Sequence, residues 1–176
     1  MSEVFGHTTS RLEDQIRTLT ERVVQLKAEL AQALARVAAL TTIDHTTGLL
    51  VWPAFVERAR SEIARATRYQ REVGLVLFAL AEPEATGGSL TFGELSEICR
   101  CKHRECDVAG QTEAGEIVLL LPETSLEGAL VIGERIRAQA VKSGGWAPKV
   151  GGASWPRHGR TLTALLSSAR NALSVL

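Results

Sequence analysis

An uninterrupted heptad pattern of apolar residues near the N-terminus limits this chain more than any other feature. The apolar positions advance in alternating steps of four and three residues, namely Leu12, Ile16, Leu19, Val23, Leu26, Leu30, Ala33, Val37 and Leu40. No proline or glycine interrupts residues 9–41. This spacing holds one apolar stripe on one side of a helix, and a second helix is needed to cover it. We therefore expect a homodimer that forms a coiled coil through residues 9–41.

The residue types along the stripe favour a parallel, two-stranded coil. Ile16, Val23 and Val37 are β-branched and occupy a positions, and leucine occupies most d positions. In a parallel dimer, however, Arg22 and Lys27 would meet across the interface with like charge. An antiparallel coiled coil is therefore one alternative to the parallel arrangement. A single amphipathic helix that folds back onto its own domain is the other alternative.

Composition limits the class of protein. The 176 residues are 45% hydrophobic, which is enough for the core of one further domain. The 20 Lys+Arg balance the 20 Asp+Glu, which argues against a general nucleic-acid binder. The longest apolar run, 74–81, is too short to cross a membrane, and the N-terminus lacks a secretory signal. We expect a cytoplasmic protein that binds neither nucleic acid nor a membrane.

The remainder of the chain predicts one α/β (α+β) domain. We assign residues 1–43 to the N-terminal helix and 44–176 to this domain. The expected elements are a helix starting at Pro53, a strand at 73–81, a helix at 91–103, a hairpin of 107–111 and 116–121, a helix at 124–141, a strand at 149–153 and a helix at 162–176. Thr124 and Glu127 have the spacing of a capping box that opens the helix at 124–141. This order predicts a central sheet flanked by helices.

Five stretches of the domain resemble the GGDEF domains of diguanylate cyclases, which make cyclic di-GMP from two GTP molecules. In order, they are 44–50 with 54–58, 107–122 (DVAGQTEAGEIVLLLP), 122–137, 150–156 and 165–173. Together they cover most of residues 44–176. The resemblance implies the nucleotidyl cyclase-like fold. A coiled coil directly before such a domain is also a common arrangement in this family.

The residues that carry the cyclase reaction in this family are replaced. Its two metal ions need carboxylates, but the first-strand positions are Ala79 and Ala81 and the third signature position is Gly115. The signature reads EAGEI, so only Glu116 of its acidic pair survives. The segment after the first strand also lacks the Asn and Asp that grip guanine in the family. We therefore expect no enzyme activity, no catalytic residue, no cofactor and no metal ion.

A second, regulatory site of the family keeps its residue types. Arg104 and Asp107 resemble its R-x-x-D motif at the right distance from the signature, and Arg135 corresponds to the arginine on the helix after the hairpin. Arginine can pair with guanine or with phosphate, and aspartate can accept the guanine N–H groups. The resemblance thus implies that cyclic di-GMP binds at these three residues. The plain alternative is a weak surface ion pair between Arg104 and Asp107.

The function that we expect is a cyclic di-GMP receptor that relays ligand occupancy through the dimer to a protein partner. A dimerisation scaffold without a ligand and a GTP-binding sensor are the alternatives. A separate cluster, Cys99, Cys101, His103 and Cys106, contains residue types that bind zinc. On a helix, however, the first three point in different directions, so we expect ordinary thiols.

Overall fold

The computed structural model describes residues 15–31, 41–80, 91–102, 104–144 and 147–173. The chain divides into two units, 1–41 and 42–176. In the first unit, residues 15–31 form the predicted helix. Five residues of its apolar stripe are 48–65% exposed, namely Ile16, Leu19, Val23, Leu26 and Leu30. The other parts of the stripe, 9–14 and 32–40, lie outside the described residues.

The second unit is built on an antiparallel sheet of four strands in the order β2-β3-β1-β4. The strands are β1 (Val73–Ala79), β2 (Val108–Gln111), β3 (Ile117–Pro122) and β4 (Lys149–Trp155). The strand predicted at 73–81 is the central strand β1, which ends at Ala79 and is buried from Val73 to Phe78. The predicted hairpin is confirmed as β2 and β3, with Gly115 at a φ of +74° in its turn.

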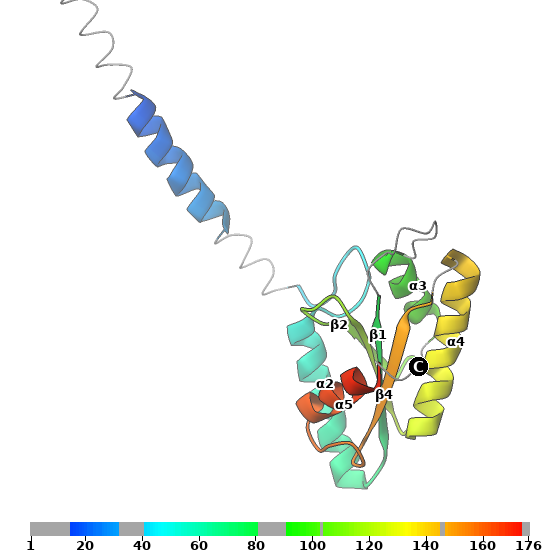
Figure 1. Ribbon diagram of the computed structural model, residues 1–176. Helices are drawn as coiled ribbons and strands as arrows, with labels where there is room; N and C mark the ends of the chain where they lie inside the picture. The colour runs from blue at the N-terminus through cyan, green and yellow to red at the C-terminus, as the bar shows by residue number, and fades with distance from the viewer. Residues whose placement is uncertain (1–14, 32–40, 81–90, 103, 145–146, 174–176) are drawn as a thin grey trace, which may run out of the picture. The chain divides into compact units, whose positions relative to one another are not determined.

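Helices cover both faces of this sheet (Figure 1), as the predicted fold class requires. The helices are α2 (Trp52–Tyr69), α3 (Phe92–Lys102), α4 (Leu126–Gly144) and α5 (Leu162–Ala172). Alternate residues of β1 serve opposite faces, since side chains alternate along a strand. Leu75 and Leu77 pack in the core under α2 and α5. Val76 and Phe78 pack in the core under α3 and α4.

The paired glycines of β4 allow helices to approach the sheet from both sides. A Cβ at Gly151 would overlap the backbone carbonyl oxygen of Ala169 on α5. A Cβ at Gly152 would lie 2.6 Å from a methyl carbon of Leu130 on α4. These two positions therefore need the absence of a side chain for close packing rather than for an unusual backbone angle.

The capping residue of α4 differs from the one that the sequence predicted. Helix α4 is capped by Ser125, whose Oγ accepts the Gly128 N–H at 3.3 Å, whereas Thr124 donates to the carbonyl oxygen of Pro122. A reciprocal capping box lies instead at α3, where Thr91 Oγ1 accepts from Glu94 N and Glu94 Oε2 accepts from Thr91 N. The hydrogen bond from Thr91 N to the Glu94 carboxylate, together with one from Thr91 Oγ1, lowers the pKa of Glu94. The closing helix ends at Ala172, before the predicted end at residue 176.

The segment that leads into the domain is tied to the edge strand β2. Asp44 Oδ1 accepts the backbone N–H groups of Thr46 and Thr47, both at 2.9 Å, and Oδ2 accepts from the Gln111 amide at 3.3 Å. These hydrogen bonds, the one from the Thr47 amide above all, lower the pKa of Asp44. Leu50 also exchanges backbone hydrogen bonds with β2, donating to Ala109 and accepting from Gln111. The entry segment therefore has a fixed course beside β2.

No helix in the described part of the chain combines the length and the apolar character needed to cross a membrane.

Candidate functional site

The turn that carries Arg104 and Asp107 lies directly before the edge strand β2. The buried Asp107 accepts the backbone N–H of Arg104 on Oδ2 at 2.6 Å, and the Asp107 N–H donates to the carbonyl oxygen of Arg104 at 3.0 Å. The carboxylate thus binds the backbone of Arg104, and no ion pair joins the two side chains among the described residues. The ion pair that was the alternative explanation of these two residues is therefore not seen in the described part of the chain, and the Arg104 side chain is exposed.

Arg135 reaches the same region from α4. Its Nη2 donates to the carbonyl oxygen of Lys102 at 2.8 Å, at the C-terminal end of α3. This hydrogen bond satisfies a carbonyl that the helix end leaves without an intrahelical donor. Because Lys102 and Arg104 are two positions apart, the contact holds Arg135 beside the segment that carries Arg104. Arg104 and Asp107 thus share one turn, and Arg135 contacts the end of α3 two positions before Arg104, but no described hydrogen bond or ion pair joins the Arg135 side chain to Arg104 or Asp107.

A cavity of about 560 Å³ lies between α2 and the start of β2, and Asp107 forms part of its wall. The helix contributes Glu57, Arg58 and Ser61, which are all exposed. Ile43 and Leu50 of the entry segment add an apolar side. A volume of this size is typical of small-molecule sites. The sequence analysis missed the α2 residues, because only the fold brings residues 57–61 next to Asp107.

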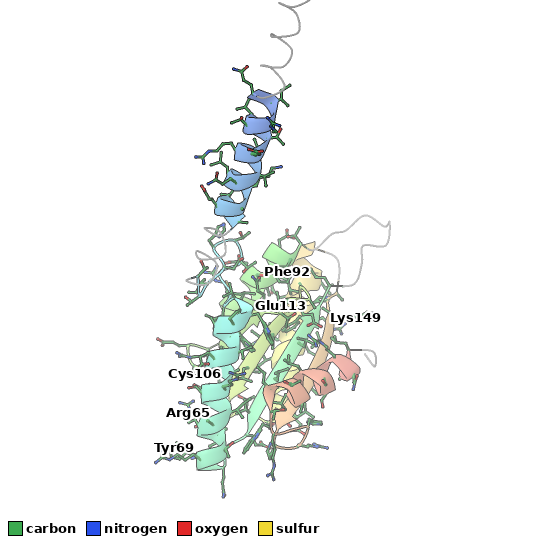
Figure 2. The ribbon with its side chains drawn as sticks, turned by 90° about the vertical axis from the view of Figure 1, so that its left-hand side faces the viewer. Arg65, Tyr69, Phe92, Cys106, Glu113 and Lys149 are labelled. Carbon is green, nitrogen blue, oxygen red and sulfur yellow. The ribbon has the colours of Figure 1, made fainter. Side chains whose placement is uncertain are left out.

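The EAGEI turn lies at the other end of the hairpin from Asp107. Figure 2 shows Glu113 and Lys149 toward one end of the sheet, with Cys106 away from it. The register of the sheet places Ala79 opposite Lys149 and Phe78 opposite Ile117, so the end of β1 meets this turn. In the GGDEF domains that this chain resembles, metal-binding acids stand at the positions of Ala79 and Gly115. The strand register brings Ala79 next to the turn that contains Gly115.

Glu116, the surviving acid of the signature, is held by an arginine of α5. Its carboxylate accepts from Arg170 Nη2 at 2.6 Å and from Arg170 Nε at 2.9 Å, and Thr112 Oγ1 donates to it at 2.8 Å. The hydrogen bond with Arg170 lowers the pKa of Glu116 more than its partial burial raises it. Sequence analysis missed this pair. The sequence offered only one signal for it, a basic residue at position 170 within the stretch 165–173.

These residues do not fit the two metal ions of the cyclase reaction. Ala79 and Gly115 provide no side-chain oxygen, and Glu116 is already paired with a guanidinium. Ala81 lies outside the described residues. Among the residues that the structure covers, no three His, Cys, Asp or Glu side chains lie close enough together to hold a metal ion.

The cysteine cluster is divided between the core and the surface. Cys99 lies on the buried side of α3, and burial raises the pKa of its thiol to about 12, whereas Cys101 and Cys106 are exposed. His103 lies outside the described residues. The described part of the cluster therefore does not converge on one point.

Comparisons with known proteins bear on the fold. No family model matches the chain, and no curated protein matches it. Among solved structures, the GGDEF domain of TpbB (YfiN) from Pseudomonas aeruginosa is similar at a TM-score of 0.63 and 22% identity, covering 76% of this chain and 87% of that one. The diguanylate cyclase SiaD from Pseudomonas aeruginosa, solved in complex with its activator SiaC, has a TM-score of 0.62 and 22% identity, covering 94% and 70%.

A third similar structure contains both parts of the predicted architecture. The coiled coil and GGDEF domain of DgcB from Caulobacter crescentus, in complex with c-di-GMP, has a TM-score of 0.59 and 17% identity, covering 93% of this chain and 92% of that one. Likeness at such low identity shows the fold alone. The predicted fold class is confirmed: this chain has the nucleotidyl cyclase-like fold of GGDEF domains.

Proposed function

We propose that this protein is a catalytically inactive GGDEF-type domain that binds cyclic di-GMP through Arg104, Asp107 and Arg135. The observation that supports the proposal is a pair of hydrogen bonds on neighbouring segments, one from Arg104 N to Asp107 and one from Arg135 to the Lys102 carbonyl oxygen. DgcB, which has the same fold, was solved with c-di-GMP.

The chemistry of the three side chains suits a cyclic dinucleotide. The exposed guanidinium of Arg104 can pair with a guanine edge or with a phosphate. Arg135 uses one Nη2 donor on Lys102 and keeps other N–H groups for a ligand. Asp107 lines the cavity beside α2 and has the acceptor oxygens that guanine N–H groups need. The backbone bond to Arg104 fixes the Asp107 carboxylate before the ligand arrives, which lowers the entropy cost of binding.

Catalytic inactivity is part of the proposal. Nucleotidyl transfer with two metal ions needs oxygen ligands that Ala79 and Gly115 cannot supply. Arg170 neutralises Glu116, so this acid is engaged before any ligand binds. Incubation of the full chain with GTP and Mg²⁺ should therefore yield no cyclic di-GMP, and turnover would contradict this part.

The coiled coil provides the route to a partner in our proposal. The exposed apolar stripe of residues 15–31 supports a homodimer, because a helix with such a face gains stability by covering it. Ligand occupancy would then be relayed through the paired stalk to another protein. SiaD, solved with its activator SiaC, is a precedent for a protein partner. The same exposed stripe also favours the second candidate, a dimeric scaffold without a nucleotide.

Isothermal titration of the full chain with cyclic di-GMP tests the receptor function. We expect micromolar binding that Arg104→Ala and Arg135→Ala each weaken by about tenfold or more, since a charge-assisted hydrogen bond contributes roughly 1.5–3 kcal/mol. Arg137→Ala is the matched control, because Arg137 lies on the same helix but pairs with Glu134. Absence of heat with cyclic di-GMP would favour the scaffold, and heat with GTP instead would favour a GTP sensor.

A further inference from the structure

A second cavity, of about 580 Å³, lies between α2 and the segment that begins α5. It shares no lining residue with the cavity beside Asp107. Figure 1 shows α2 and α5 on the same side of the sheet. The apolar part of its wall is formed by Trp52, Val56, Ile63, Leu162 and Leu166. Burial of an apolar body against these side chains would be favourable, at about 25 cal/mol per Å² removed from water.

The charged side chains that line this cavity are all positive. Arg60 of α2 and Arg160, just before α5, are exposed and line it, and no acidic side chain does. Within the part of the chain that the structure describes, neither guanidinium has an ion pair. The chain as a whole has no net charge, so this positive character is local. Two guanidinium groups at the edge of an apolar cavity attract an anion that also has an apolar part.

The side chains that line this cavity indicate which kind of ligand it can bind. The Trp52 ring stacks on the Phe55 ring, with centroids 5.7 Å apart and planes 16° apart, so the indole is held as a flat surface. The volume falls in the range of single small-molecule ligands. Thr161 and Thr163 are the uncharged polar residues of the lining, and Thr161 Oγ1 already accepts from Ala164 N at 3.2 Å. The arginines are therefore the main polar recognition groups.

We propose that this cavity binds an amphiphilic organic anion, which has an aromatic or acyl body and one carboxylate or sulfonate group. The apolar body lies against Trp52, Val56 and Leu166, and the acidic group faces Arg60 and Arg160. This site is separate from the proposed cyclic di-GMP site. It does not depend on the proposed receptor function.

Fluorescence titration with two related dyes tests the proposal. The full chain is titrated with 1-anilinonaphthalene-8-sulfonate and with N-phenyl-1-naphthylamine, which has a similar body but no charge. We expect saturable binding of the sulfonate dye, weakened about tenfold by combined Arg60→Gln and Arg160→Gln, with the uncharged dye unchanged. Arg137→Gln on α4 is the control and should leave both dyes unaffected. Equal sulfonate binding by the double variant, or none by the natural chain, would overturn the proposal.

A second pair of variants tests the position of the site without removing an arginine. Ala64 is exposed and lines the cavity, so Ala64→Glu and Ala64→Gln add side chains of similar size that differ in charge. We expect Ala64→Glu to weaken the sulfonate dye several-fold more than Ala64→Gln does, whereas the uncharged dye responds equally to both. Equal responses of the sulfonate dye to the two variants would place its binding elsewhere and contradict the proposal. Circular dichroism of each variant confirms that it is folded.

Discussion

The guanidinium of Arg170 on α5 binds the carboxylate of Glu116, the residue directly before β3, with Nη2–Oε2 at 2.6 Å and Nε–Oε1 at 2.9 Å. These residues are 54 positions apart in the chain. Their ion pair joins the closing helix to the hairpin whose turn corresponds to the cyclase signature. A protein cation thus neutralises the one signature acid that remains.

Removal of Arg170 should destabilise the domain. The Glu116 side chain is only 13% exposed, so Arg170→Ala would leave a mostly buried carboxylate with Thr112 as its remaining side-chain donor. Because Arg170 itself is 45% exposed, solvent screening limits the loss to about 1–2 kcal/mol. Urea unfolding measures this loss. Arg137→Ala, which breaks a more exposed pair with Glu134, should cost less than about 0.5 kcal/mol. Equal effects of the two variants would contradict this account.

The same pair predicts a pH dependence. Arg170 lowers the pKa of Glu116 in the folded state. Its contribution to stability is therefore present above the unfolded-state pKa of glutamate, about 4.3, and is lost as the pH falls through the lower folded-state pKa. The stability advantage of the natural chain over Glu116→Gln should be largest near pH 7 and should shrink below about pH 4. Thermal unfolding of both proteins across this range provides the comparison, and a constant difference would refute the assigned role.

Two glycine substitutions should have opposite effects. Gly151→Ala would place a Cβ against the backbone carbonyl oxygen of Ala169, which cannot rotate away, so we expect a loss of about 3 kcal/mol or more. Gly93 lies in α3, and a Cβ at this position would meet only Thr91 Oγ1, at 4.0 Å, among the described residues. Gly93→Ala should therefore stabilise the domain by about 0.5–1 kcal/mol, because alanine favours the helix. Melting temperatures of the two variants should lie on opposite sides of that of the natural chain.

The exposed stripe of residues 15–31 should control the oligomeric state. Val23→Asp and Leu26→Asp would put a charge into the seam of the proposed coiled coil, and we expect a monomer in analytical ultracentrifugation. Glu21 occupies an outer position of the heptad, so Glu21→Gln should stay dimeric. A natural chain that sediments as a monomer would contradict the coiled coil itself.

Periodicity and turn residues were sufficient to predict the elements of the domain. The buried run at 73–79 and the hairpin around Gly115 were visible because a short apolar run of strand-forming residues and a turn glycine are local signals. Capping was less predictable, because Thr124 and Ser125 are adjacent and both residue types can cap a helix. In the structure Ser125 is the cap, and Thr124 bonds to Pro122 instead.

The residues of the proposed site were chosen from the sequence, and the contacts that they make were seen only in the structure. Sequence spacing suggested that Arg104 and Asp107 could form an ion pair, whereas the turn directs the carboxylate to the Arg104 backbone. The contact between Arg135 and Lys102 depends on how α3 packs against α4, which no local pattern encodes. For the same reason, the pairing of Arg170 with Glu116 appears only when the sheet and α5 are assembled.

The most direct test of the central claim is to locate the ligand on the protein. Amide chemical shifts of the full, isotope-labelled chain are followed by nuclear magnetic resonance as cyclic di-GMP is added. The account predicts that the largest shifts occur at Arg104–Val108 and at Arg135, with little change at the turn containing Glu113 and Gly115. No shift at saturating ligand, or shifts confined to that turn, would contradict it.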